Sequence, residues 1–154
     1  VGPEGPTLKR EIARLKLGDH AILHGVSEKI EEEINQAHLL IHSAWHEPFG
    51  LILIEAMACG IPVISFNTGG PAELVSNGKD GFLIEKDDLE DFANRVLELK
   101  NNESQRKQFG LAAIKSAKQF GLKNYTKKIE TLYQELAAKR GIDSAQDRSS
   151  AVGL

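Results

Sequence analysis

The chain lacks most of the features that mark specialised classes of protein. Its single cysteine, Cys59, excludes an internal disulfide and fits a reducing compartment. No apolar run approaches the roughly 20 residues that a helix needs to cross a bilayer, and no signal peptide is recognisable. A net charge of −3 gives no overall electrostatic reason to bind nucleic acid. A globular protein that neither binds nucleic acid nor carries a transmembrane segment is therefore expected.

What the chain does contain is ordinary for such a protein. It has 154 residues, with 41% hydrophobic and 27% charged side chains, which is enough for one domain with a core. The chain begins at Val1 and enters directly on a glycine turn, so it is expected to be a fragment cut just after an upstream strand. Residues 1–140 are expected to form the domain. The apolar period stops at Gly141, so residues 141–154 are expected to form a disordered tail.

Short apolar runs alternate with helical patterns along the chain. Strands are expected at residues 21–24, 38–42, 62–66 and 82–84. Helices are expected at residues 7–17, 28–37, 51–59, 71–75, from a capping box at Asp87 and Glu90 onward, 104–120 and 124–140. This alternation predicts an α/β fold, with a parallel sheet and helices on both of its faces. Ligands of such sheets bind beyond the carboxyl ends of the strands, which directs attention to the loops VGPEGP, WHEPFG and NTGGP.

The segment EPFGLILIEAMACG places two carboxylates unusually. It reads as a tight turn followed by a helix, whose unpaired N–H groups and dipole favour an anion such as phosphate. Glu55 has only apolar helix neighbours, and a buried carboxylate is costly unless it is hydrogen-bonded, for example by ribose hydroxyls. The alternative places Glu55 on a narrow solvent-facing stripe. Glu47 likewise has an alternative role as an acidic residue stabilised at a helix start.

The two carboxylates form a Glu-x7-Glu pattern, which AMACGIPVI, GGPAELV and GKDGFLI follow. Together with the turns VGPEGP and HGVS, these blocks resemble the donor-binding, C-terminal half of family 4 retaining glycosyltransferases (glycosyl transferases group 1). The resemblance covers about Val1 to Leu136. It implies a Rossmann-like half of a two-domain GT-B enzyme. Such an enzyme transfers a sugar from a UDP- or GDP-linked donor to a hydroxyl acceptor, which a missing N-terminal domain would bind.

The resemblance also implies roles for single residues. Glu47 would contact the transferred sugar as the catalytic carboxylate, and Glu55 would bind the ribose hydroxyls. The other donor-binding residues would be Phe49, Gly50 and Leu51 at the phosphates or sugar, Gly2 in the cleft, Gly25, Val26 and Ser27 near the base, and Gly69 and Gly70 beside the sugar. For Gly25, Gly69 and Gly70, a plain role as turn glycines stays open.

The resemblance has gaps that limit what the chain alone is expected to do. The family usually supplies an Arg and a Lys to the donor pyrophosphate from a segment before VGPEGP, and these 154 residues do not contain that segment. Lys79, in a turn cluster, is interpreted as a solvated loop lysine. Residues 1–154 alone are therefore expected to be inactive in transfer. The full-length enzyme is expected in the cytoplasm, with peripheral attachment to the cytoplasmic membrane face left open, and with no cofactor besides its donor substrate.

Two other functions compete with this interpretation. A nucleotide-sugar-binding module without turnover would carry the same donor residues. A metal-dependent hydrolase would use His38, His42 and His46, which are spaced by four and would share one side of a helix. The run HLLIH has the length and composition of a strand, however, so no metal site is expected. The segments GGPAE and EAMACG also look like those of sucrose-synthesising enzymes in the same family, which makes UDP-glucose a reasonable donor.

Overall fold

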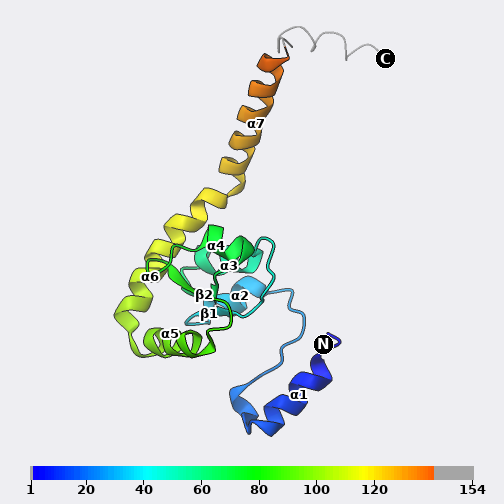
Figure 1. Cartoon of the computed structure of the whole chain (residues 1–154), viewed down its shortest axis with the longest axis vertical. Helices are drawn as coiled ribbons and strands as arrows, with labels where there is room; N and C mark the ends of the chain where they lie inside the picture. Colours follow the sequence, from blue (N-terminus) through cyan, green and yellow to red (C-terminus); the bar gives the residue numbers. More distant parts are fainter. Residues whose placement is uncertain (1, 141–154) are drawn as a thin grey trace. The chain divides into compact units, whose positions relative to one another are not determined.

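The computed structural model of the chain (Figure 1) describes residues 2–140 and divides into two compact units, Val1–Glu33 and Ile34–Leu154. The tail predicted at residues 141–154 lies outside the described residues. Each unit is described by itself. Within residues 2–140, none of the helices combines the length and the apolar character that a membrane-spanning segment requires.

The first unit contains α1 (Gly5–Arg14) and the 3-10 turn η1 (Gly18–His20). The predicted start of α1 at Thr7 is wrong by two residues, because Pro6 fits the first helical turn, where no N–H is needed. The strand predicted at residues 21–24 is also wrong: this segment has no strand assignment. A strand requires a neighbour for its backbone N–H and C=O groups, and the described chain pairs none with these residues.

The second unit is built on a parallel sheet. Among the described residues, β1 (Leu40–His42), β2 (Val63–Phe66) and β3 (Gly81–Ile84) lie in the order β1-β2-β3, and both pairings are parallel. The register places His42 beside Ser65 and Ser65 beside Leu83. All four residues of β2 are buried, as an apolar central strand requires. Three of the four predicted strands and their parallel arrangement are thereby confirmed.

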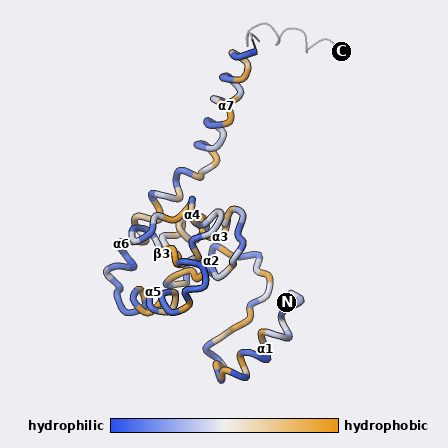
Figure 2. The backbone as a smooth tube through the Cα atoms, viewed as in Figure 1, coloured by the Kyte–Doolittle hydropathy of each residue, from blue (hydrophilic) through white to orange (hydrophobic). Residues whose placement is uncertain are grey.

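The helices of the second unit follow the predicted order with shifted ends. They are α2 (Ile30–Asn35), which crosses the boundary between the units, α3 (Leu51–Ala58), α4 (Gly69–Leu74), α5 (Leu89–Asn101), α6 (Glu103–Ala117) with the 3-10 turn η2 (Lys118–Phe120), and α7 (Leu122–Lys139). The predicted capping box is one residue off, because Asp88 caps α5 by accepting a hydrogen bond from the Asp91 N–H at 2.9 Å. Figure 2 shows that hydrophobic residues recur along α7 between hydrophilic ones, and none of its side chains is buried.

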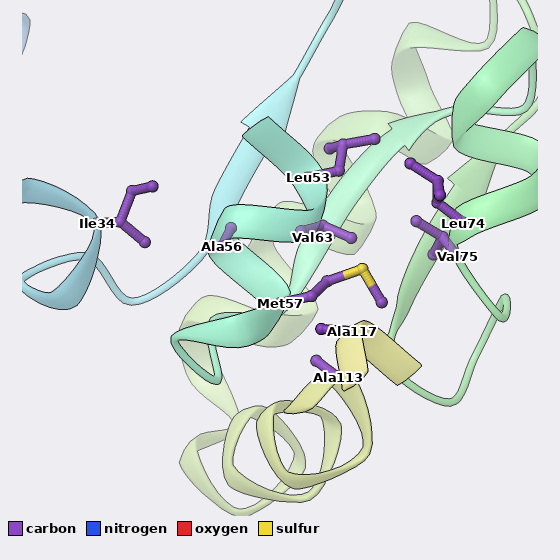
Figure 3. Close-up of a cluster of buried hydrophobic side chains, with 9 residues drawn as sticks. All are labelled: Ile34, Leu53, Ala56, Met57, Val63, Leu74, Val75, Ala113 and Ala117. Carbon is purple, nitrogen blue, oxygen red and sulfur yellow. The ribbon is translucent and has the colours of Figure 1, made fainter. Parts of the chain in front are cut away.

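Two hydrophobic clusters cover the two faces of the sheet. Val63 packs into the first cluster, which α3, α4 and the end of α6 supply and which Figure 3 shows around Met57. Ile64, the next residue of β2, packs into the second cluster with side chains of β3, α5 and the start of α6. Because neighbouring residues of a strand point to opposite faces, β2 joins both clusters. The predicted helices on both faces are confirmed.

The helices α3 and α6 touch through small residues. Gly60, with φ of 75°, follows the end of α3 in the left-handed conformation that glycine commonly adopts there. A Cβ atom on Gly110 of α6 would collide with the Gly60 carbonyl oxygen. Ala113 and Ala117 continue the same side of α6 into the first cluster. The absence of larger side chains therefore sets how closely the two helices approach.

A buried carboxylate ties the loop before β3 to α6. Asp80 is fully buried, and its Oδ1 accepts a hydrogen bond from the Ser76 N–H at 2.8 Å. Its Oδ2 accepts a hydrogen bond from the Ser116 hydroxyl at 2.6 Å. Both oxygens are thus satisfied, as a buried carboxylate requires.

Replacing Gly110 by alanine tests the contact between α3 and α6. Gly110→Ala should lower the free energy of unfolding by about 1–3 kcal/mol, because the added methyl group must push backbone away. Intrinsic helix propensity alone predicts the opposite, a gain of about 1 kcal/mol. Urea unfolding followed by circular dichroism measures the difference. Gln108→Ala, at an exposed position of the same helix, is the control and should change little. A variant as stable as the parent chain would contradict this packing.

Candidate functional site

Polar and glycine-rich loops gather at one edge of the parallel sheet. Residues 43–50 follow β1 and lead into α3, residues 67–68 follow β2 and lead into α4, and residues 85–88 follow β3. Because parallel strands end at the same edge, these loops share the side on which α/β sheets bind their ligands. Two of the three loops singled out in the sequence, WHEPFG and NTGGP, lie here.

Glu47 is held within its own loop. Its side chain is 25% exposed, and Oε1 accepts a hydrogen bond from the Phe49 N–H at 3.2 Å. Oε2 lies 3.3 Å from Nε2 of His42, the last residue of β1. The N-cap of α3 is Gly50, and no side chain caps the helix. Glu47 therefore does not cap α3, and its carboxylate sits before the helix; its alternative role as an acidic residue stabilised by the helix dipole stays open.

Gly50 starts α3 in a conformation that favours glycine. Its φ is 94°, and its carbonyl oxygen accepts hydrogen bonds from the N–H groups of Leu53 and Ile54. The N–H groups of a first helical turn lack partners within the helix, and the helix dipole makes that end favourable for an anion. Phe49 and Leu51 on either side are exposed, at 49% and 65%. The predicted helix start therefore lies at the edge that carries Glu47, and its binding of an anion stays a prediction.

Glu55 does not lie where the sequence placed it. The helix α3 packs into the first cluster through Leu53, Ala56 and Met57, whereas Glu55 and Leu51, one turn earlier, are exposed. The expectation of a buried carboxylate is therefore wrong, and the solvent-facing alternative is correct. The side chain of Glu55 has no hydrogen bond or ion pair with any residue in 2–140, so its oxygens are free to accept hydrogen bonds from a ligand.

Gly69 and Gly70 have a backbone role that the structure makes explicit. The Gly70 N–H donates to the Glu47 carbonyl oxygen at 2.9 Å. A Cβ atom on Gly69 would lie 2.5 Å from that same oxygen, and one on Gly70 would collide with the backbone of Phe49. The two glycines thus let the start of α4 lie directly against residues 47–49. Their predicted position beside a sugar stays a prediction.

Three of the four donor-binding residues predicted in the first unit line the same pocket. Gly2 lines a pocket of about 410 Å³ that Gly25 and Val26 also line, although more than 20 residues separate them in sequence. Gly25 has φ of 80°, and Val26 is 94% exposed. Ser27 does not line this pocket; its hydroxyl oxygen accepts a hydrogen bond from the Lys29 N–H at 3.0 Å. The structure therefore groups three of the four residues.

Sequence reasoning missed two contacts at the sheet edge. One is the approach of His42 to Glu47, for which the position of His42 at the end of a parallel strand was the available signal. The other surrounds Trp45, which is 44% exposed. Its ring meets that of Phe66 edge-on at 5.9 Å between centroids, and Nζ of Lys86 lies 5.1 Å from its centroid. These contacts anchor the loop 43–50 to the ends of β2 and β3.

Comparison with known proteins identifies relatives of this arrangement. The family model described as "Glycosyl transferases group 1" matches residues 1–116. The N-acetyl-alpha-D-glucosaminyl L-malate synthase of Bacillus anthracis is 30% identical over 136 residues, which cover 88% of this chain and 36% of that protein. The first curated relatives that the chain matches are therefore much longer, and the chain spans about a third or less of their length.

Solved structures share the fold of the chain. A mutant of S. aureus TarM in complex with Fondaparinux, alpha-GlcNAc-glycerol and UDP gives a TM-score of 0.80 at 25% identity, covering 86% of this chain and 27% of that one. Anabaena Alr3699/HepE in complex with UDP gives 0.77 at 29% identity, covering 84% and 36%. The Anabaena protein is also solved in complex with UDP-glucose. These matches confirm the predicted α/β fold of GT-B type.

The histidines are predicted not to hold a metal. His38 precedes β1, His42 ends it, and His46 lies in the loop, so the three do not share a helix face; within residues 2–140 no group of three His, Cys, Asp or Glu side chains is placed to hold an ion. The purified chain, dialysed against a weak chelator, should contain far less than one zinc per molecule by elemental analysis. Stoichiometric zinc that survives dialysis and is lost in His42→Ala would contradict this prediction.

Proposed function

Because the chain belongs to the group 1 glycosyl transferases, we propose that it supplies the donor site of a retaining glycosyltransferase. The enzyme would transfer a sugar from a nucleotide diphosphate sugar to a hydroxyl group. One observation carries this proposal: Glu47 lies just before α3 at the carboxyl edge of a parallel sheet, and Glu55, exposed and without a partner among residues 2–140, lies one turn into the same helix. The two carboxylates would serve the two halves of the donor, its sugar and its nucleoside.

The nucleoside diphosphate would bind along α3. Its phosphates would meet the helix start, where the backbone of Phe49, Gly50 and Leu51 offers N–H groups and the dipole favours negative charge. The ribose hydroxyls would donate hydrogen bonds to Glu55, whose oxygens no described residue occupies. The donor-binding roles of Gly2, Gly25, Val26 and Ser27, which the family resemblance implies, belong to the same proposal. The UDP complexes of the TarM and Alr3699/HepE relatives support a uridine donor, and the UDP-glucose complex supports a hexose.

Glu47 would act at the transferred sugar. A carboxylate beside the reacting carbon stabilises the positive charge that develops there when the bond to the diphosphate weakens. The start of α3 would stabilise the departing diphosphate at the same moment. Gly69 and Gly70 would shape the cleft beside the sugar. The acceptor, whether a glycan, a lipid-linked or a small molecule, would be bound by a part of the enzyme outside this chain, and catalysis would rest on positioning and electrostatics.

Substituting each carboxylate by alanine in the intact enzyme tests the two roles. Glu55→Ala should weaken both the free nucleotide diphosphate and the nucleotide sugar about tenfold or more, because a hydrogen bond to a charged group contributes roughly 1.5–3 kcal/mol. Glu47→Ala should leave nucleotide diphosphate affinity nearly unchanged while transfer collapses, because its partner is the sugar. Calorimetric titration and an initial-rate assay measure both variants.

The results for Glu47→Ala and Glu55→Ala distinguish a transferase donor site from a binding module without turnover. Glu130→Ala, at an exposed position of α7, is the matched control and should change neither quantity. A loss of nucleotide diphosphate binding in Glu47→Ala, but not in Glu55→Ala, would reverse the assigned roles. If Glu47→Ala bound the donor normally and the parent enzyme catalysed no transfer, the chain would be a nucleotide-sugar-binding module. If neither substitution affected binding or turnover in a folded enzyme, the donor-site proposal would fail.

A further inference from the structure

Three buried polar atoms lack hydrogen-bond partners in the described part of the chain, and all three lie toward the edge that carries Glu47. They are Nε2 of His42, the hydroxyl oxygen of Ser65 and the hydroxyl oxygen of Thr68. A buried polar group without a partner costs free energy, and such groups are rare in native proteins. Their gathering at one edge therefore indicates a function there. Among the three, His42 is the one that lies within 4 Å of a predicted site residue, Glu47.

The sheet fixes where the His42 side chain lies. His42 pairs in register with Ser65, and Leu40 pairs with Val63. Residues two apart on a strand share a face, and Leu40 and Val63 both belong to the first hydrophobic cluster. His42 therefore lies on the sheet face that α3 covers, directly before the loop that carries Glu47. A packed strand, unlike a flexible loop, holds such a ring in one place.

With His42 beside it, each carboxylate oxygen of Glu47 has a polar neighbour within the protein. Oε1 of Glu47 already accepts the Phe49 N–H, and Nε2 of His42 lies 3.3 Å from Oε2. This distance is within ion-pair range, although the direction of the contact does not yet meet the geometry of a hydrogen bond. Hydrogen bonds in catalytic sites often tighten only when the substrate is bound. A small rotation of the ring or the carboxylate would satisfy both partners.

We propose that His42 is a positioning residue for Glu47. Its Nε2–H holds Oε2 while the Phe49 N–H holds Oε1, so the carboxylate keeps a single orientation toward the sugar. His42 itself touches neither donor nor acceptor in this proposal. The inference rests on the proposed function, because orientation matters only if Glu47 acts on the sugar. Holding reacting groups in the correct geometry is worth one to several powers of ten in rate.

Two nearly isosteric variants of the intact enzyme separate positioning from packing. Glutamine carries an N–H donor at the same number of bonds from Cβ as Nε2 of histidine, whereas methionine fills a similar volume without a donor. His42→Met should lower kcat about tenfold or more. His42→Gln should keep kcat within about threefold of the parent, since the donor is retained. Both should bind nucleotide diphosphate as the parent does, and both should unfold at similar temperatures. His38→Gln, an exposed histidine before the same strand, is the control.

A second substitution, at Glu47, tests whether His42 affects kcat through that carboxylate. In a Glu47→Gln background, His42→Met and His42→Gln should have equal kcat, because the carboxylate that His42 orients is gone. Equal losses of kcat by both His42 variants, no loss in His42→Met, or weakened nucleotide diphosphate binding would each overturn the inference. If Glu47→Ala retained full transfer, the proposed function would fail instead, so the two failures are distinguishable.

A crystal structure of the parent enzyme with its nucleotide sugar provides a test that does not depend on variants folding. Nε2 of His42 and Oε2 of Glu47 should then lie within about 2.7–3.0 Å of each other, as a charge-assisted hydrogen bond requires. A separation beyond about 4 Å would overturn the inference, because no direct contact would then orient the carboxylate.

Discussion

No side chain fits between the backbone of Phe49 and that of Gly70, and this close approach shapes the whole sheet edge. It brings the loop after β1 against the start of α4, and the Gly70 N–H then reaches the Glu47 carbonyl oxygen. A similar approach joins Gly60 and Gly110 at the other end of α3. The helix α3 is thus fixed at both ends by contacts that only glycine permits.

The chemistry of the site depends on this fixed helix. Because α3 is held, the orientation of its start and the exposure of Glu55 are properties of the scaffold and need no ligand to create them. Glu47 accepts the Phe49 N–H within its own loop, and His42 at the end of β1 lies 3.3 Å from its other oxygen. One carboxylate is therefore oriented by the protein and the other is left open for a ligand. That division fits the proposed function, in which one carboxylate acts on the sugar and the other binds the nucleoside.

The sequence predicted the second unit well because its elements are defined by local patterns. Apolar runs such as PVISF specify where elements lie without knowledge of their neighbours. The strand at residues 21–24 failed because a strand exists only with a partner, which its own residues do not specify. The burial of Glu55 failed for a related reason. Apolar neighbours on all sides do not reveal which side of α3 meets β2, and the contacts of Leu53, Ala56 and Met57 decide this. The approach of His42 to Glu47 depends on the path of the loop 43–50, which no local pattern encodes.

The buried carboxylate of Asp80 has a consequence for how the second unit opens. It links the turn before β3 with Ser116, which lies 36 residues further along the chain in α6. If α6 detached, a desolvated carboxylate would lose one of its partners, so the turn and the helix are energetically coupled. Opening of α6 is therefore more costly than the loss of its apolar contacts alone, because it also strips a buried carboxylate of a hydrogen bond.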